Sequence, residues 1–164
     1  MTETFDFIAP LMMHTTGLRM YYLPLPIDIG DAFSEAKVRR IVGTVSGAPI
    51  RRALHGRRDA ERTITLSKAF VRKQKLTLGD LVPITLAADP EPDFVDIPEE
   101  FDAALKGDPD AAARFATFTP GKQRSLVTYI HNGKRTQTRV KRALETAYKL
   151  RTYTLRSDLE QQEA

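Results

Sequence analysis

The residues best suited to bind a ligand are the cations in the last third of the chain. Residues 111–156 contain 11 Lys and Arg side chains and a single acid, Glu145, so the formal net charge of this segment is +10. Guanidinium groups bind phosphate and carboxylate through paired hydrogen bonds. This density of charge predicts an anion-binding cluster at the start of the last long helix. Its candidate residues are Lys134, Arg135, Thr138, Arg139 and Arg142.

Arg139 has a second interpretation, which is structural. The acids of the chain concentrate just before the basic segment, because residues 89–110 hold nine Asp and Glu against one cation, Lys106. Acidic and basic segments of this kind can neutralise each other within a fold. For Arg139 we favour this role, in which it pairs with an acid and locks the C-terminal helices to the N-terminal part. The candidate partners are Glu99, Glu100, Asp102 and the acids of residues 89–96.

The remaining composition favours neither an enzyme nor a metal site. The chain has no Cys, and its three His residues, His14, His55 and His131, are far apart in the sequence. It has no Gly-rich phosphate loop after a strand and no HExxH motif. Ser46 lies in a strand–turn–strand pattern, unlike the serine of a nucleophile elbow. We therefore predict a non-enzymatic protein without a cofactor, a metal or a catalytic residue.

The N-terminal part is expected to form short strands. Polar and apolar residues alternate at residues 4–9, which is the period of a half-buried strand. Further strands are expected at residues 20–25, 39–45, 50–54, 63–66, 76–78, 81–86 and 94–97, with a polar loop at 55–60. Short helices are expected at 29–36 and 68–73, with Ser67 as the cap of the second.

Four residues are expected to form the turns between these strands. Gly43, Gly47 and Gly79 can adopt positive φ without a Cβ clash. The carboxylate of Asp80 can accept backbone N–H bonds across a turn, so we interpret Asp80 as a turn residue and not as a catalytic acid.

The C-terminal part is expected to be helical. Helices should begin near residues 98, 109 and 120, because Pro occupies the first helical turn at each place. Gly133 is expected to end the third of these helices in a left-handed conformation. The last helix is then capped by Thr136 and faces the core with Val140, Leu144 and Tyr148, which follow a helical spacing.

Two parts of the chain resemble known bacterial families. Residues 42–50, 64–68 and 79–82 resemble a domain of unknown function that precedes YdeI/OmpD-associated tails. The second part resembles the YdeI/OmpD-associated, or bacteriocin-protection, family and is the more specific match, since it fixes many polar residues. The residues that carry it are 97–98, 101–105, 115, 119–124, 130, 133–135 and 138–142.

The resemblance implies an α+β fold, mainly β in its N-terminal part. That part is expected to be a small double-split β-barrel capped by helices, related in topology to AbrB-type DNA-binding domains and followed by a C-terminal helical segment. We therefore expect a barrel domain at residues 1–96, a helical segment packed on it at 97–156, and a disordered tail at 157–164.

The same resemblance implies a link to envelope stress or to tolerance of bacteriocins and antimicrobial peptides. We predict a binding or adaptor protein whose basic helix contacts an anionic small molecule or an acidic protein surface. The alternative is a nucleic-acid-binding protein, which the sequence pI of about 9.4 and the AbrB-like topology favour. The N-terminus lacks the pattern of a signal peptide and no apolar run approaches about 18 residues, so a cytoplasmic location is expected.

Overall fold

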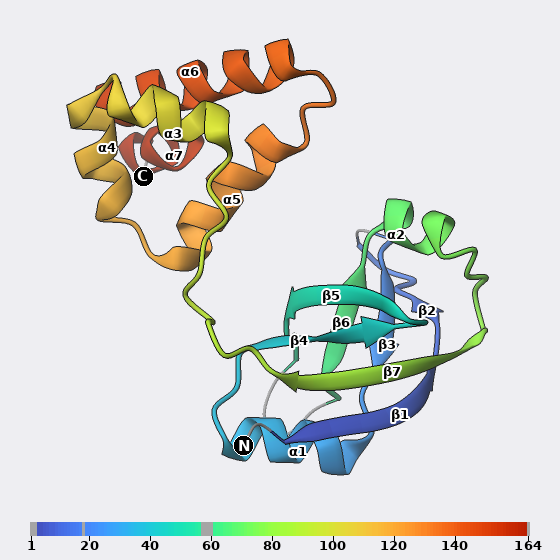
Figure 1. The fold of residues 1–164 in the computed structure, drawn as a ribbon. Coiled ribbons are helices and arrows are strands. Elements are labelled where there is room, and N and C mark those ends of the chain that lie inside the picture. Colours follow the sequence, from blue (N-terminus) through green and yellow to red (C-terminus); the bar gives the residue numbers. More distant parts are fainter. Residues whose placement is uncertain (1–2, 18, 57–60, 164) are drawn as a thin grey trace. The chain divides into compact units, whose positions relative to one another are not determined.

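The computed structural model describes residues 3–17, 19–56 and 61–163, and these form two compact units, Met1–Pro92 and Asp93–Ala164. The first unit contains the strands and the second is helical (Figure 1). The predicted α+β class, with strands in the N-terminal part and helices in the C-terminal part, is confirmed. Most of the predicted polar loop at 55–60 lies outside the described residues.

The elements of the first unit follow the expected order closely. The strands are β1 Thr4–Pro10, β2 Met12–Met13, β3 Tyr21–Pro24, β4 Arg40–Val45, β5 Ala48–Ala53, β6 Thr63–Leu66 and β7 Leu81–Ala88. The helices are α1 Ile27–Glu35 and α2 Lys68–Lys73. The hydroxyl of Ser67 accepts a hydrogen bond from the backbone N–H of Phe70, which confirms Ser67 as the cap of α2. The predicted strand at 94–97 is absent, and these residues lead into the first helix of the second unit.

The strands form two antiparallel sheets. One has the order β1-β7-β4-β5 and the other the order β2-β3-β6. The chain passes from β1 to β2 through the fully buried Leu11, and an isolated bridge between His55 and Thr63 links the end of β5 to the start of β6. Within the described residues the ladders do not join into a closed barrel.

The inner faces of both sheets share one apolar core. Ile41, Leu86 and Ile64 are fully buried in it. Phe5 of β1 meets Phe33 of α1 edge to face, with ring centroids 5.2 Å apart, so α1 covers part of this core. Polar and apolar residues alternate along β1 because every second side chain faces the core, as predicted.

The turn residues divide into three that were predicted correctly and one that was not. Ser46 and Gly47 both have positive φ, at 51° and 78°, in the hairpin between β4 and β5. Gly79 has φ of 89°, and the Asp80 carboxylate accepts a 2.8 Å hydrogen bond from the N–H of Thr77.

Gly43, by contrast, lies inside β4 and not in a turn. It is paired with Ile50 on one side and with Leu86 on the other. A Cβ atom at this position would lie 1.8 Å from the carbonyl oxygen of Thr85. The constraint on Gly43 is therefore the close approach of β7, which strand periodicity in the sequence does not reveal.

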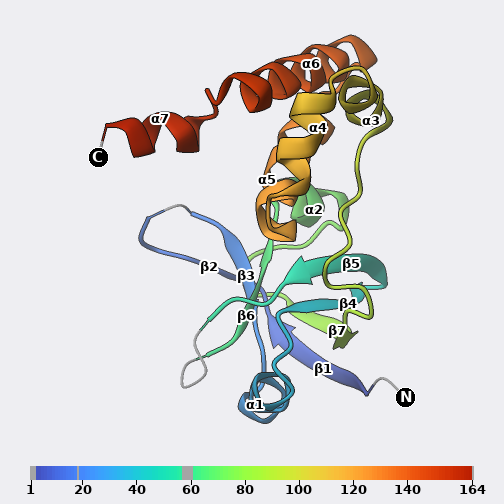
Figure 2. The same ribbon diagram turned by 90° about the vertical axis from the view of Figure 1, so that its left-hand side faces the viewer.

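The second unit is built from five described helices. They are α3 Glu99–Lys106, α4 Pro109–Ala116, α5 Pro120–His131, α6 Thr136–Thr152 and α7 Arg156–Gln162. α6 contacts α3, α4 and α5 (Figure 2). Their core contains Phe101, Phe115, Ile130 and Leu150. The expected starts near 98, 109 and 120 are confirmed, and side-chain oxygens of Asp108 and Thr119 cap α4 and α5.

Disorder was expected at residues 157–164, but α7 includes residues 157–162 of this segment, which contradicts the expectation there. Tyr153 ends α6 in the left-handed region, with φ of 55°. The Asp158 carboxylate then accepts hydrogen bonds from the backbone N–H of Leu155 and from both terminal nitrogens of Arg114. This long-range ion pair orders a segment whose local sequence is polar, which explains why the sequence alone did not predict it.

The geometry around Gly43 leads to a stability prediction. Gly43→Ala should lower the free energy of unfolding by about 3 kcal/mol, because β4 and β7 must separate to admit the methyl group. Gly47→Ala is the control, since nothing lies within 4 Å of a Cβ there, and its positive φ should cost about 1 kcal/mol. Urea-induced unfolding of the full chain measures the free energy of unfolding of both variants. Equal losses of stability in the two variants would contradict the close approach of β7 to Gly43.

Candidate anion-binding site on the second unit

The residues of the predicted anion-binding cluster lie in the turn between α5 and α6 and in the first turns of α6. α5 ends at His131, and Asn132 keeps right-handed helical angles, with φ of −70°. Gly133 has no positive φ either, so the predicted left-handed stop is wrong. Gly133 is instead buried, and the side chain of Arg139 packs directly on it. An added Cβ would lie 2.9 Å from the Arg139 Cγ. The glycine is needed for this contact.

Arg139 binds groups within the second unit. Its Nε donates to Glu100 Oε1 at 2.9 Å, Nη1 donates to the Gly133 carbonyl at 3.0 Å, and Nη2 donates to Thr136 Oγ1 at 3.1 Å. The hydrogen bond from Arg139 holds the pKa of the Glu100 carboxyl below its ordinary value. Arg139 therefore fixes the α5–α6 turn and ties α6 to α3. The pairing of Arg139 with an acid is thus supported, with Glu100 as the partner, but both residues lie in the second unit, so this ion pair is not the predicted lock to the N-terminal part.

Arg142 is also engaged inside the unit. Its Nη1 donates a 2.8 Å hydrogen bond to the carbonyl of Tyr129, and its guanidinium carbon lies 4.6 Å from the centre of the Tyr129 ring. Thr138 lies half-buried on α6, one turn before Arg142. Arg142 thus holds α6 against α5.

Most other cations of the basic segment have internal partners too. The partners are carboxylates for four of them, a backbone carbonyl for one and an aromatic ring for one. The pairs are Arg114–Asp158, Lys149–Glu145, Arg151–Asp108, Arg156–Glu160, Arg124 with the Phe94 carbonyl, and Lys122 over the Phe118 ring. The charge of +10 in the sequence therefore overstates what this segment offers to a partner.

Three exposed cations remain, which we call the cation group: Lys134, Arg135 and Lys141. Among the described residues none of their side chains has an ion pair or a hydrogen bond. Lys134 and Arg135 immediately precede α6, and Lys141 lies in its second turn. Two of the five predicted residues thus belong to the cation group. Lys141 is not among the predicted residues, and only the pairing of the neighbouring cations distinguishes it.

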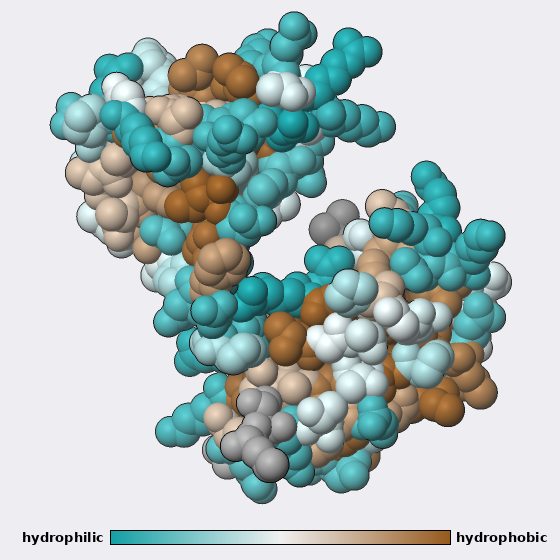
Figure 3. Space-filling model, viewed as in Figure 1, coloured by the Kyte–Doolittle hydropathy of each residue, from teal (hydrophilic) through white to brown (hydrophobic). Residues whose placement is uncertain are grey.

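The outer face of α6 carries an unexpected run of apolar side chains, which we call the apolar stripe: Val140, Leu144 and Tyr148. Their exposed fractions are 41%, 58% and 56%, so the prediction that they face the core is wrong. The side chains that do face the core are those of Ala143, Thr146, Ala147 and Leu150. Figure 3 shows hydrophobic atoms at the surface over α6 among hydrophilic ones.

The reason lies in the size of the side chains. α6 packs against α3 and α4 through Ala143 and Ala147, and small residues allow helices to approach closely. α6 therefore has two faces with helical apolar spacing, and the smaller residues occupy the core.

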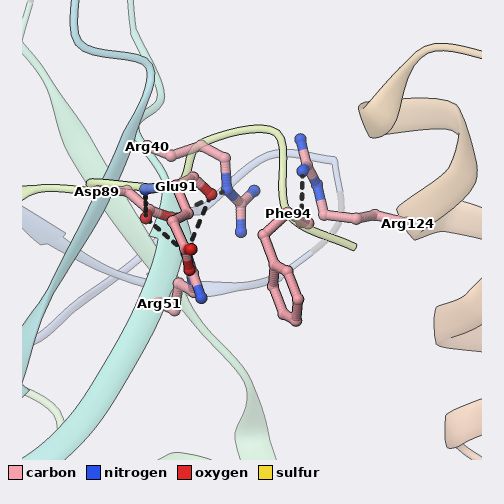
Figure 4. A network of polar contacts seen from close by, with 6 residues as sticks. All are labelled: Arg40, Arg51, Asp89, Glu91, Phe94 and Arg124. Carbon is pink, nitrogen blue, oxygen red and sulfur yellow. Dashed lines mark hydrogen bonds and ion pairs between the residues drawn. The ribbon is translucent and has the colours of Figure 1, made fainter. Parts of the chain in front are cut away.

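A second polar network lies in the first unit, around the fully buried carboxylate of Asp89 (Figure 4). Arg51 binds it with both arms of its guanidinium group, at 2.7 and 2.6 Å, and the N–H of Glu91 donates to it at 2.8 Å. Arg40 Nε lies 3.8 Å away. The hydrogen bond from Arg51 lowers the pKa of Asp89 against the opposing effect of burial. This pair ties β5 to the end of β7 across β4.

The His residues do not form a metal centre among the described residues, since no group of three His, Asp or Glu side chains there could hold an ion. His14 and His55 line one open groove of the first unit. His131 lies in the second unit, where its Nε2 is 2.8 Å from the Asp96 carbonyl oxygen. In the described parts of the chain, none of the helices has the length and apolarity needed to span a membrane.

A protein-family model matches part of the chain. Residues 95–152 match the model of the family described as bacteriocin-protection, YdeI or OmpD-associated. The matched segment contains α3, α4, α5 and α6 with both the cation group and the apolar stripe. This confirms the resemblance of the C-terminal part. Neither a curated protein nor a solved structure is significantly similar to the chain.

The bonds of Arg139 lead to a prediction about stability. Arg139→Ala should lower the melting temperature of the helical unit by about 5 °C, because Glu100 and the Gly133 carbonyl lose their donor. Lys141→Ala is the control on the same helix, since Lys141 has no such contact among the described residues, and it should leave the transition in place. Thermal unfolding followed by circular dichroism measures both, and an unchanged transition in Arg139→Ala would refute its structural role.

Asp89 leads to a prediction about acid stability. Since its pKa is lowered in the folded protein, its ionised form stabilises the first unit fully above the unfolded pKa of about 3.9, and this contribution disappears as the pH falls through the lower folded pKa. Asp89→Asn should therefore unfold more easily at pH 7 and lose less stability between about pH 5 and pH 2.5 than the unchanged chain.

Urea unfolding at a series of pH values tests this expectation. Asp31→Asn is the control, because Asp31 is exposed on α1 and has no ion pair among the described residues. A stability-versus-pH curve of Asp89→Asn that parallels the original curve would show that Asp89 is not the group responsible.

Proposed function

We propose that this chain is a non-enzymatic cytoplasmic binding protein that holds an anionic partner against the cation group. Its second unit is of the bacteriocin-protection, YdeI or OmpD-associated type, and we infer a role in tolerance of bacteriocins or related envelope stress. The partner is an acidic protein surface or an anionic small molecule.

The observation that carries this proposal is that some cations of this segment are bound inside the unit while their neighbours are exposed. Arg139 and Arg142 are bound to α3, to the turn and to α5. Lys134, Arg135 and Lys141 lie on the same short segment, and among the described residues their side chains have no hydrogen bond or ion pair. The hydrogen bond from Lys149 lowers the pKa of Glu145, and Lys141 is close enough to Glu145 to add to this lowering. A backbone held in this way presents its cations at a fixed spacing, which reduces the entropy lost when a ligand binds.

Nucleic-acid binding is the alternative function. It requires the two sheets of the first unit to act as an AbrB-like double-split β-barrel. The sequence pI of about 9.4 favours it. Yet most cations of the basic segment already have internal partners, and a duplex needs several unpaired ones along its backbone.

The test is a binding titration with two fluorescent probes, an oligoglutamate peptide and a DNA oligonucleotide in duplex and single-stranded form. The full chain should bind the peptide, and the triple variant Lys134→Gln, Arg135→Gln, Lys141→Gln should bind it about 30-fold more weakly, from three exposed ion pairs of under about 1 kcal/mol each. The matched control replaces Lys68, Arg72 and Lys73 of α2 by Gln, which removes the same charges from an exposed helix of the first unit.

The two functions give different results in this experiment. Tighter binding of DNA than of the peptide, with log affinity falling steeply against log salt, would establish the nucleic-acid alternative. Equal losses in the triple variant and in the α2 control would mean that charge alone matters and would refute the cation group as a site.

A further inference from the structure

The apolar stripe borders a groove between α3 and α6. Ala103, Ala104 and Gly107 line it on the α3 side, and Leu144 and Ala147 line it on the α6 side. Its volume is about 310 Å³. Because the residues at its base are Ala and Gly, the groove can admit large apolar side chains from outside.

One ion pair belongs to this groove, since Arg151 and Asp108 both line it and bind each other at 3.0 Å. A second pair, Arg139 with Glu100 at 2.9 Å, lies outside its lining near the starts of α6 and α3. The two charged residues of the groove are thereby neutralised by each other. The rest of its lining is mainly apolar, so charge recognition must come from beyond it.

The shape of the stripe indicates a helical occupant. Val140, Leu144 and Tyr148 recur every four residues and extend over about 12 Å of helix. An apolar ridge with the same spacing on another helix would fit beside them, as in other helix-in-groove complexes. An isolated small anion would leave this apolar surface uncovered.

The distribution of charge indicates an acidic helix in particular. Lys141 follows Val140 directly on α6, and Lys134 and Arg135 precede the stripe. Glu99 and Asp110 are exposed on α3 and α4. An extended polyanion such as a duplex or an anionic membrane would meet these carboxylates as well as the cations. A single helix lying along α6 would meet the cation group, while the nearest carboxylates, Asp108 and Glu145, are paired with Arg151 and Lys149.

We propose that the groove and the apolar stripe dock an acidic amphipathic helix of a partner protein, with its apolar residues against Leu144 and Tyr148 and its carboxylates against the cation group. This inference rests on the proposed function, for which it names the class of partner. It goes beyond that function by requiring apolar recognition as well as charge.

The experiment compares two labelled synthetic peptides of equal net charge and similar helicity. Both are rich in Glu, and one carries Leu at every fourth position where the other carries Gln. The full chain should bind the Leu peptide at least about tenfold more tightly, because burial of apolar area adds to the ion pairs. The double variant Leu144→Gln, Tyr148→Gln should remove this preference while binding the Gln peptide as before.

Two further variants separate the possible failures. Leu159→Gln is the control, since Leu159 is exposed on α7 outside the groove, and it should keep the preference. The triple variant of the cation group should weaken binding of both peptides. If it weakens both while the chain shows no preference for Leu, the apolar docking is refuted and the proposed function stands. If it changes neither, the proposed function fails.

Other occupants would give different signals with the same proteins. A full chain that is dimeric by light scattering, and monomeric as Leu144→Gln, Tyr148→Gln, would show that a second copy covers the groove. Binding to vesicles of phosphatidylcholine and phosphatidylglycerol that disappears in the same variant would assign the stripe to a lipid surface. Either result would overturn the protein-helix assignment.

Discussion

The side chain of Arg139 joins the start of α3, which is distant in the sequence, to the α5–α6 turn and the first turn of α6. It binds Glu100 at the start of α3, the Gly133 carbonyl in the turn and Thr136 at the start of α6. Gly133 is needed because the aliphatic part of Arg139 packs on it. The direction of α6 depends on these contacts. The cation group lies at its start and in its second turn, and the apolar stripe follows on its outer face.

Features set by local chemistry were predictable from the sequence. Pro109 and Pro120 begin helices whose caps are the preceding Asp108 and Thr119. Ser67 caps α2 in the same way. Each of these signals acts within about one turn of backbone, where the missing N–H of Pro or a side-chain oxygen decides the conformation. The fold class followed from such signals together with strand periodicity.

Features set by distant partners were not predictable. Gly43 is required by the carbonyl of Thr85, which comes from another strand. α7 depends on Arg114, which lies 44 residues before Asp158. On α6 two faces have helical apolar spacing, and the choice between them follows from how closely α3 and α4 can approach Ala143 and Ala147. Periodicity identifies such faces, but only packing selects the one that is buried.

The candidate site illustrates why net charge is a poor guide to binding. Of the five predicted residues, Arg139 and Arg142 have the most internal hydrogen bonds and the least freedom to bind a ligand. The hydrogen bond from Arg139 lowers the pKa of Glu100, and the hydrogen bond from Arg114 lowers the pKa of Asp158, so both ion pairs persist to lower pH than pairs with ordinary carboxyl groups would. Lys134, Arg135 and Lys141 remain for the anionic partner that we propose. Three exposed charges give modest affinity by themselves, so the selectivity that we propose depends on the adjoining apolar surface of Leu144 and Tyr148 as well.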